Sequence, residues 1–297
     1  MAVDTTTAPE LTQEQVQKIL IQPLEAASVF LAAGPRIFDT AGPIRIPKLG
    51  AATDPDWHGE NEQIDEDDVT FDEILLLPSH MKSVKTLTRF SNELARQSVV
   101  ALDQAIKDRL VRDVAAKLDH AFIAGAAAEA PAVQDTPLGI LNYPGVQTVA
   151  AVGAVAFDPF LDAWGKLLAA NANPAAAKWF MRPETFVKLR KLKDGQQRYQ
   201  MQPDPTQDGV FRLFGSQVVV TDRIPLTGAG SSRKTSAFLA DFSQVAVARD
   251  QAPSVKLLDQ TFGDYDQQAI RVTARYDAAP LNAEAVVVLQ DVNEPAA

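Results

Sequence analysis

The stretch Ser91–Gly125 has the sequence SNELARQSVVALDQAIKDRLVRDVAAKLDHAFIAG. Ser91 suits the N-cap of a helix, and Gly125 suits its end. Apart from an interruption at Ser98, apolar residues recur at every fourth position: Leu94, Leu102, Ile106, Leu110, Val114, Leu118 and Phe122. The spacing predicts one helix over about residues 91–124, roughly 50 Å long, which would act as a structural spine. Two shorter helices that break near Ser98 are the alternative.

A strongly acidic stretch precedes this helix. Between Leu49 and Met81 there are ten carboxylates and no Lys or Arg, which equals the formal net charge of −10 of the whole 297-residue chain. The ten are Asp54, Asp56, Glu60, Glu62, Asp65, Glu66, Asp67, Asp68, Asp72 and Glu73. The flanking segments Ile44–Leu49 and Val69–Leu77 are strand-like. The pattern therefore predicts a hairpin-like arm with an acidic tip.

The tip of this arm has too few apolar residues to form a core of its own, with Trp57 and Ile64 as the large ones. It is either a solvated loop or a segment that contacts another protein surface, which supplies the missing cations. The densest run of acids is Asp65, Glu66, Asp67 and Asp68. That run lacks the Gly and the distal Glu of a calcium loop, so a solvated acidic tip is the preferred interpretation over a metal site.

Overall composition predicts a soluble globular protein with two subdomains, since 46% of the residues are hydrophobic and 22% charged. No apolar run approaches the roughly 18 residues of a membrane span. The N-terminus lacks the pattern of a secretory signal, so we expect folding in the cytoplasm and no membrane partner. The absence of cysteine excludes disulfides and thiolate metal sites. A pI near 4.8 argues against tight nucleic-acid binding.

Further elements are predicted on both sides of a small-residue linker, Ala126–Thr136, which marks a subdomain boundary. Helices are predicted over Glu10–Leu20, from Asp158 to about Asn171, and over Glu184–Lys193 after Pro183. The predicted strands are Trp179–Met181, Phe211–Phe214, Gln217–Thr221, Ala237–Leu239, Val245–Ala248, Ala269–Tyr276 and Ala285–Leu289.

No catalytic signature is present. The histidines His58, His80 and His120 are scattered, and HExxH, GxSxG and Walker A patterns are missing. We therefore expect no enzyme activity, no cofactor and no metal. A metal-dependent hydrolase that uses the acidic cluster is the remote alternative, which metal content and chelation would test.

The basic residues have one concentration, which comprises Lys178, Arg182, Lys188, Arg190, Lys191, Lys193 and Arg198. It is either a solvated helix face or a contact surface for acid, on a neighbouring copy or on nucleic acid. If the acidic arm docks on a neighbour, we expect its targets to be Lys82, Lys85 and Arg89, beside the spine helix. Lys188, Lys191 and Lys193 are the second choice.

The order of these parts resembles the tailed-bacteriophage major capsid proteins with the Hong Kong 97-like fold (phage capsid family). Five segments carry the resemblance: ILLLPSHMKSVKTLTRFSNE at Ile74–Glu93, PLGILN at Pro137–Asn142, FMRPETFVKLRKLKD at Phe180–Asp194, LFGSQVVVTDRIP at Leu213–Pro225 and AIRVTARYDAAPLNAEAVVVL at Ala269–Leu289. None is a strict motif, but their order and spacing extend over nearly the whole chain.

The resemblance implies an α+β fold with four parts. These are an N-terminal arm (1–43), an extended loop formed by the acidic hairpin (44–81), a peripheral domain (82–134 and 258–297) that contains the spine helix, and an axial domain (135–257). The extended loop of the family crosses onto a neighbouring subunit.

The implied function is that of a structural protein of the virion. Its copies would form pentamers and hexamers of an icosahedral head around double-stranded DNA, assembled in the cytoplasm of the host bacterium. Portal and decoration proteins are candidate partners. Contact with packaged DNA should be weak and nonspecific, because the excess negative charge repels it. An encapsulin-type nanocompartment shell is the alternative with the same fold.

Two departures from relatives shape these expectations. Fewer than about 45 residues precede the hairpin, too few for a built-in scaffolding domain, so we expect a separate scaffolding protein. Some relatives also join a hairpin Lys to an Asn of a neighbour. Here the tip has no Lys, Lys48 lies at its base, and residues 258–281 contain no Asn. We therefore expect no covalent crosslinking.

Overall fold

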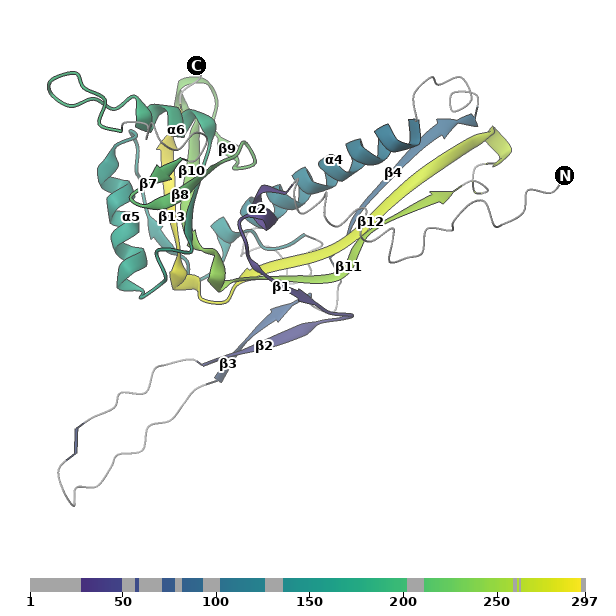
Figure 1. Cartoon of the computed structure of the whole chain (residues 1–297), viewed down its shortest axis with the longest axis horizontal. Helices are drawn as coiled ribbons and strands as arrows, with labels where there is room; N and C mark the ends of the chain where they lie inside the picture. Colours follow the sequence, from purple (N-terminus) through teal and green to yellow (C-terminus); the bar gives the residue numbers. More distant parts are fainter. Residues whose placement is uncertain are drawn as a thin grey trace.

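The computed structural model describes residues 28–49, 57–58, 71–77, 82–92, 102–125, 136–201, 211–258, 261 and 263–294. Within these ranges the chain forms two large sheets, a long helix and a projecting hairpin (Figure 1). The predicted helix Glu10–Leu20 and nearly all of the predicted linker Ala126–Thr136 lie outside the described residues.

A four-stranded sheet is ordered β1 (Arg36–Asp39), β11 (Val245–Leu258), β12 (Gln267–Pro280) and β4 (Val84–Ser91). The β1–β11 pair is parallel and the other two pairs are antiparallel. The long helix α4 (Leu102–Ala124) lies along one face of β4 and β12 (Figure 1). The short helix α2 (Val29–Ala32), which belongs to the first described segment, packs against α4 through Phe30 and Leu31.

Helix α4 confirms the predicted spine over the residues that are described. Leu110, Val114, Leu118 and Phe122 are buried in one cluster with Phe90 and alternate residues of β12, namely Ile270, Val272, Ala274 and Tyr276. The side chains of Leu102 and Ile106 and the segment 93–101 lie outside the description. Gly125 ends the helix where the backbone passes close to Gly139, since a Cβ on Gly139 would lie 2.3 Å from the Gly125 nitrogen.

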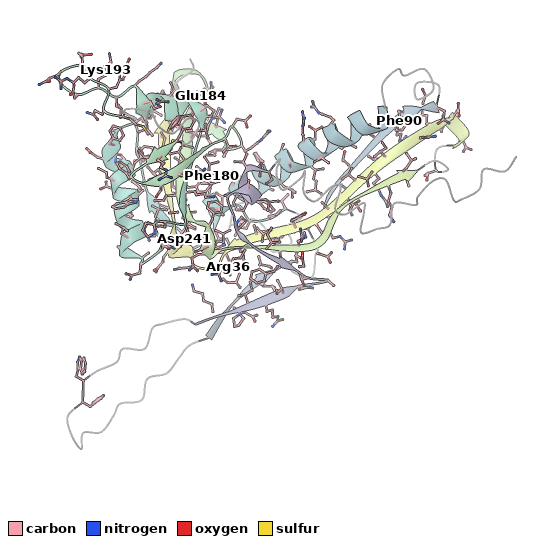
Figure 2. The ribbon with its side chains drawn as sticks, in the orientation of Figure 1. Arg36, Phe90, Phe180, Glu184, Lys193 and Asp241 are labelled. Atoms are coloured by element: carbon pink, nitrogen blue, oxygen red, sulfur yellow. The ribbon has the colours of Figure 1, made fainter. Side chains whose placement is uncertain are left out.

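The second sheet has seven strands. Six follow the order β5 (Gln147–Val149), β13 (Val286–Asn293), β10 (Lys234–Asp241), β6 (Ala177–Met181), β8 (Ser216–Val220) and β7 (Arg212–Leu213), and β9 (Leu226–Thr227) pairs with β10. Helices α5 (Phe157–Ala169) and α6 (Pro183–Arg190) pack with it through Phe160, Leu167, Phe186 and Leu189. Phe180 lies in the middle of this sheet (Figure 2) and belongs to the core cluster of α4.

Five 3₁₀ turns complete the secondary structure of the described residues. They are η1 (Ile140–Asn142), η2 (Gly230–Ser232), η3 (Phe242–Gln244), η4 (Gly263–Tyr265) and η5 (Ala283–Ala285). Helix α6 ends at Arg190 rather than at Lys193, because Asp194 closes a turn by accepting the backbone N–H groups of Gln196 and Arg198 at 2.9 and 2.8 Å. Lys191 and Lys193 therefore follow the helix.

The two sheets do not coincide with the expected axial domain (135–257) and the expected C-terminal part of the peripheral domain (258–297), because each sheet contains strands from both ranges. Strand β11 was expected to stop at Ala248, but it continues to Leu258 along β12. Register shifts between Arg249 and Ser254 interrupt its side-chain alternation and accommodate Pro253, so the sequence pattern is lost there. Conversely, β13 belongs to the seven-stranded sheet, where residues Val286–Leu289 are buried on both faces. The long strands β11 and β12 thus belong together, and β13 does not join them.

Strands β2 (Ile44–Leu49) and β3 (Phe71–Leu76) form a separate antiparallel pair, with Ile44 opposite Leu76 and Leu49 opposite Phe71. The pairing confirms the two strands predicted on either side of the acidic stretch. Figure 1 shows this pair projecting from the body on the side of the four-stranded sheet that faces away from α4.

Candidate functional site

The base of the projecting hairpin is fixed to β12 by one buried carboxylate, that of Asp277. Its oxygens accept the backbone N–H of Leu77 at 2.9 Å and that of Ala278 at 3.0 Å, and the Lys82 Nζ lies 3.1 Å from both. The side chain of Lys82 is 10% exposed and that of Asp277 is 3% exposed. The Asp277 carboxylate thus binds both Leu77, at the end of the hairpin, and Lys82, five residues later in the chain.

Apolar packing supports the same junction. Leu76 and Leu77 are buried against Ala246, Ala248 and Ala279 of the four-stranded sheet. Leu77 has a left-handed backbone, with φ of 51°, a conformation that non-glycine residues adopt at a cost of about 1–3 kcal/mol. A costly turn held by a hydrogen bond, an ion pair and apolar contacts gives the hairpin a defined direction relative to the sheet.

A second buried carboxylate, Asp119 on α4, holds the first described segment of the chain. It accepts hydrogen bonds from the Ser28 hydroxyl at 2.5 Å and from the backbone N–H groups of Val29 and Phe30 at 3.0 and 3.1 Å. Burial raises the pKa of Asp119 above its ordinary value, although these hydrogen bonds act in the opposite direction. The contact fixes the N-terminal segment on the spine helix.

A third polar contact fixes the end of β13. The Arg182 guanidinium donates to Glu294 Oε1 at 3.0 Å and to the carbonyl oxygens of Asp222 and Ile224 at 2.8 and 2.9 Å. Burial raises the pKa of the Glu294 carboxyl above its ordinary value, and the guanidinium counters this shift. Arg182 therefore has a structural role within its own chain.

The residues predicted to contact a neighbour are not gathered at one place. Trp57 is fully exposed, and Asp65, Glu66, Asp67 and Asp68 lie outside the described residues. Lys82 is buried with Asp277, so its ammonium group is already paired within the chain. Lys85 and Arg89 are exposed on β4.

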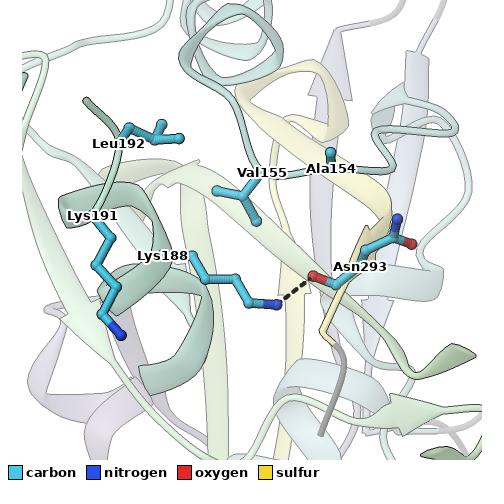
Figure 3. A pocket seen from close by; sticks show the side chains of 6 residues that line it. All are labelled: Ala154, Val155, Lys188, Lys191, Leu192 and Asn293. Carbon is cyan, nitrogen blue, oxygen red and sulfur yellow. Dashed lines mark hydrogen bonds between the residues drawn. The ribbon is translucent and has the colours of Figure 1, made fainter. Parts of the chain in front are cut away.

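Two of the three second-choice lysines, Lys188 and Lys191, line a pocket of about 420 Å³ (Figure 3). Its lining is apolar at Ala154, Val155 and Leu192 and polar at Lys188, Lys191 and Asn293. Figure 3 shows the Lys188 ammonium directed to the backbone oxygen of Asn293, at 3.0 Å. Lys193 lies outside the pocket, with its Nζ 5.0 Å from the centre of the Tyr199 ring.

Sequence reasoning missed Asp277, Asp119 and the pair Arg182–Glu294. A signal was present for Asp277, because a carboxylate in the otherwise apolar strand end YDAAP requires a partner once it is buried. The identity of that partner was not readable, since Lys82 is 195 residues away.

Neither a metal site nor a membrane span emerges from the described residues. Their His, Asp and Glu side chains form no group of three or more that could hold a metal ion. None of their helices has the length and apolar content that a membrane span requires.

Comparisons of the sequence with known proteins identify similarity to phage capsid proteins. The model of the Phage capsid family matches residues 10–291. The major capsid protein of Klebsiella oxytoca phage phiKO2 is 23% identical over 217 residues, which is 70% of this chain and 48% of that protein. The chain thus spans about half the length of this curated relative.

Solved structures share the fold over a larger fraction of the chain. A chain from the capsid of a native GTA particle superimposes with a TM-score of 0.71 and 18% identity, over 89% of this chain and 90% of that one. A chain of Mycobacterium phage Adephagia gives a TM-score of 0.69 and 18% identity, over 91% of each chain.

Proposed function

This chain belongs to the phage capsid family, and we propose that it is a structural major capsid protein with the Hong Kong 97-like fold. Its copies would form pentamers and hexamers of an icosahedral head that encloses double-stranded DNA. The observation that carries this proposal is the family match over residues 10–291. Shell geometry, DNA enclosure, the virion as final location and the scaffolding, portal and decoration partners are all part of the proposal.

The hairpin base supports an inter-subunit role for residues 44–81. A solvated loop needs no fixed direction, whereas the junction at Leu77, Lys82 and Asp277 is held by buried polar and apolar contacts. The tip itself carries eight acids and no cation between residues 50 and 70. We therefore propose that the extended loop reaches a neighbouring subunit, and that electrostatic attraction contributes to this contact.

Neutralising the tip should weaken assembly without unfolding the subunit. Each exposed ion pair contributes at most about 1 kcal/mol, but a shell repeats the contact in every copy. Replacing Asp65, Asp67 and Asp68 by Asn and Glu66 by Gln should leave circular dichroism and melting of the lone subunit nearly unchanged. Negative-stain microscopy and sedimentation should show fewer rings and shells than the original chain forms, and a weaker dependence of assembly on salt.

Two results would contradict this proposal. Normal assembly of the variant at every salt concentration would mean that the tip is only solvated. Unfolding of the variant would mean that the tip belongs to the subunit's own core. If the original chain forms no ring or shell, with or without a scaffolding protein, the capsid function itself is wrong.

We also propose that the mature shell has no covalent crosslinks between subunits, because the tip offers no Lys and residues 258–281 offer no Asn. Particles boiled in denaturant should give a single band at the 32.1 kDa monomer mass. A ladder of covalent oligomers on the same gel would overturn this expectation.

A further inference from the structure

The pocket beside α6 lies between three segments of the chain that are fixed to one another. Its lining residues come from the loop before α5, from α6 with the residues that follow it, and from the end of β13: Ala154, Val155, Lys188, Lys191, Leu192 and Asn293 (Figure 3). The Gly153 N–H donates to the Asp291 oxygen at 3.1 Å, and the Gly153 oxygen accepts the Asn293 N–H at 2.8 Å, so the loop is joined to β13. The Lys188 ammonium, at 3.0 Å from the Asn293 oxygen, joins α6 to the same strand. The pocket is therefore already formed in a single chain.

One part of the lining is apolar. Val155 and Leu192 are half-buried and pack against the core of the seven-stranded sheet, and Ala154 beside them is exposed. The volume of about 420 Å³ falls within the range of about 300–1,000 Å³ that is typical of ligand-binding pockets. An aliphatic group placed here would remove apolar surface from water, which is favourable.

The other part of the lining is basic. A lysine ammonium has three N–H donors, and that of Lys188 uses one of them on the Asn293 oxygen. Lys191 follows three residues later and is exposed, so the two like charges are neighbours at the end of the helix. Among the residues that the structure describes, no ion pair joins either lysine to a carboxylate. Both lysines thus retain donors and positive charge for an anionic group.

The carboxylates of the surrounding segments are engaged elsewhere. Glu294 is buried and has the Arg182 guanidinium at 3.0 Å, and Asp291 has the Lys234 ammonium at 3.2 Å. The Asp194 carboxylate closes the turn after α6 by accepting two backbone N–H groups. The pocket thus combines two cations with an apolar wall and has no acid in its lining. This charge arrangement complements an anionic partner.

The mixed lining distinguishes between classes of anion. Nucleic-acid phosphates would contact the lysines but leave the apolar wall without an occupant. The formal net charge of −10 of the chain also opposes the approach of a dense polyanion. A peptide that carries an aliphatic side chain next to carboxylates satisfies both parts of the lining. Outside the pocket, Lys193 and the exposed ring of Tyr199, with Nζ 5.0 Å from the ring centre, offer further contacts to a longer segment.

We propose that this pocket binds an acidic segment of another protein. An aliphatic side chain of that segment would pack against Val155 and Leu192, and its neighbouring carboxylates would accept hydrogen bonds from Lys188 and Lys191. The Asn293 side-chain amide, in the same lining, supplies another donor. The inference goes beyond the proposed function, because the pocket belongs to one subunit and does not depend on a shell.

Fluorescence anisotropy with the purified 297-residue chain tests this contact. The probe is a fluorescein-labelled hexapeptide with two central leucines between pairs of glutamates. One control peptide has glutamines in place of the glutamates, and the other has serines in place of the leucines. We expect saturable binding of the probe with a Kd below about 1 mM, and about tenfold weaker binding of each control peptide.

Three variants of the chain locate the binding. Lys191→Glu should weaken binding of the probe about tenfold, because an attraction is replaced by a repulsion. Lys117→Glu, at an exposed position of α4, makes the same change in net charge and should leave binding unchanged. Ala154→Phe should weaken binding at least about tenfold by filling the pocket. Both pocket positions are exposed, so circular dichroism and melting of these variants should match those of the original chain.

Four results would overturn the inference, and each leaves the proposed function intact. The first is the absence of saturable binding up to about 1 mM, and the second is equal binding of the three peptides. The third is an oligomer of six thymidines that binds more tightly than the probe and loses affinity with Lys191→Glu, which would indicate a nucleic-acid surface. The fourth is weaker self-assembly of Lys191→Glu than of Lys117→Glu in sedimentation without peptide, which would make a second copy of the chain the occupant.

Discussion

Replacing Asp277 with alanine should lower the free energy of unfolding by about 3–5 kcal/mol, the loss typical of removing one partner of a buried ion pair. The Lys82 ammonium, 10% exposed, would keep its charge without a counter-ion. The backbone N–H groups of Leu77 and Ala278 would lose their acceptor as well. Urea unfolding followed by circular dichroism measures the loss.

Two comparisons separate this effect from a general loss of charge. Asp113→Ala removes the exposed pair with Arg109 and should change the unfolding free energy by about 0.5 kcal/mol or less. Lys82→Met should cost less than Asp277→Ala, because it leaves the carboxylate with both backbone donors. A loss below about 1 kcal/mol for Asp277→Ala would show that water replaces the carboxylate and that the hairpin base is not fixed by it.

Replacing Leu110 with alanine should lower the unfolding free energy by about 2–5 kcal/mol, as in other large-to-small changes within a core. Leu110 is buried, and it lies in one cluster with Phe90, Ile270 and Val272. The substitution would therefore leave a cavity between α4 and the strands β4 and β12, and the apolar contacts of Leu110 with them would be lost. Thermal and urea unfolding of the purified subunit both report this loss.

The matched control is Arg109→Ala on the same helix. The Arg109 side chain is 77% exposed, so the change should be about 0.5 kcal/mol or less. If Leu110→Ala costs no more than Arg109→Ala, the apolar stripe of α4 does not support the sheet.

Several elements could be predicted from the sequence because their signals are local. The four-residue spacing predicted the buried side of α4, and the strand-like flanks of the acidic stretch predicted β2 and β3. The apolar runs at Trp179–Met181 and Ala285–Leu289 predicted β6 and β13. Among the predicted contact residues, Lys82 is paired with Asp277 within its own chain. Contacts of the other predicted residues with a neighbour stay predictions.

The sheet assignment of β11 and β13 could not be predicted from the sequence. Apolar runs indicate that a strand is buried, but not which strand it pairs with. Strand β11 continues past Ala248 only because register shifts near Pro253 keep it alongside β12. The polar residues of β11 after Ala248 therefore belong to a strand, although their sequence lacks the alternation of apolar and polar residues that would predict one.

The sequence by itself determined the buried side of the long helix, the two hairpin strands and the separation of charge, since helical period, strand alternation and acid content are properties of neighbouring residues. Tertiary structure alone decided which distant groups meet. Asp277 reaches Lys82 across 195 residues, and Arg271 lies between Leu87 and Lys256 only in the observed register. The physical reason is that register depends on the packing of the whole sheet against α4, and a shift of one residue would turn Arg271 into the core.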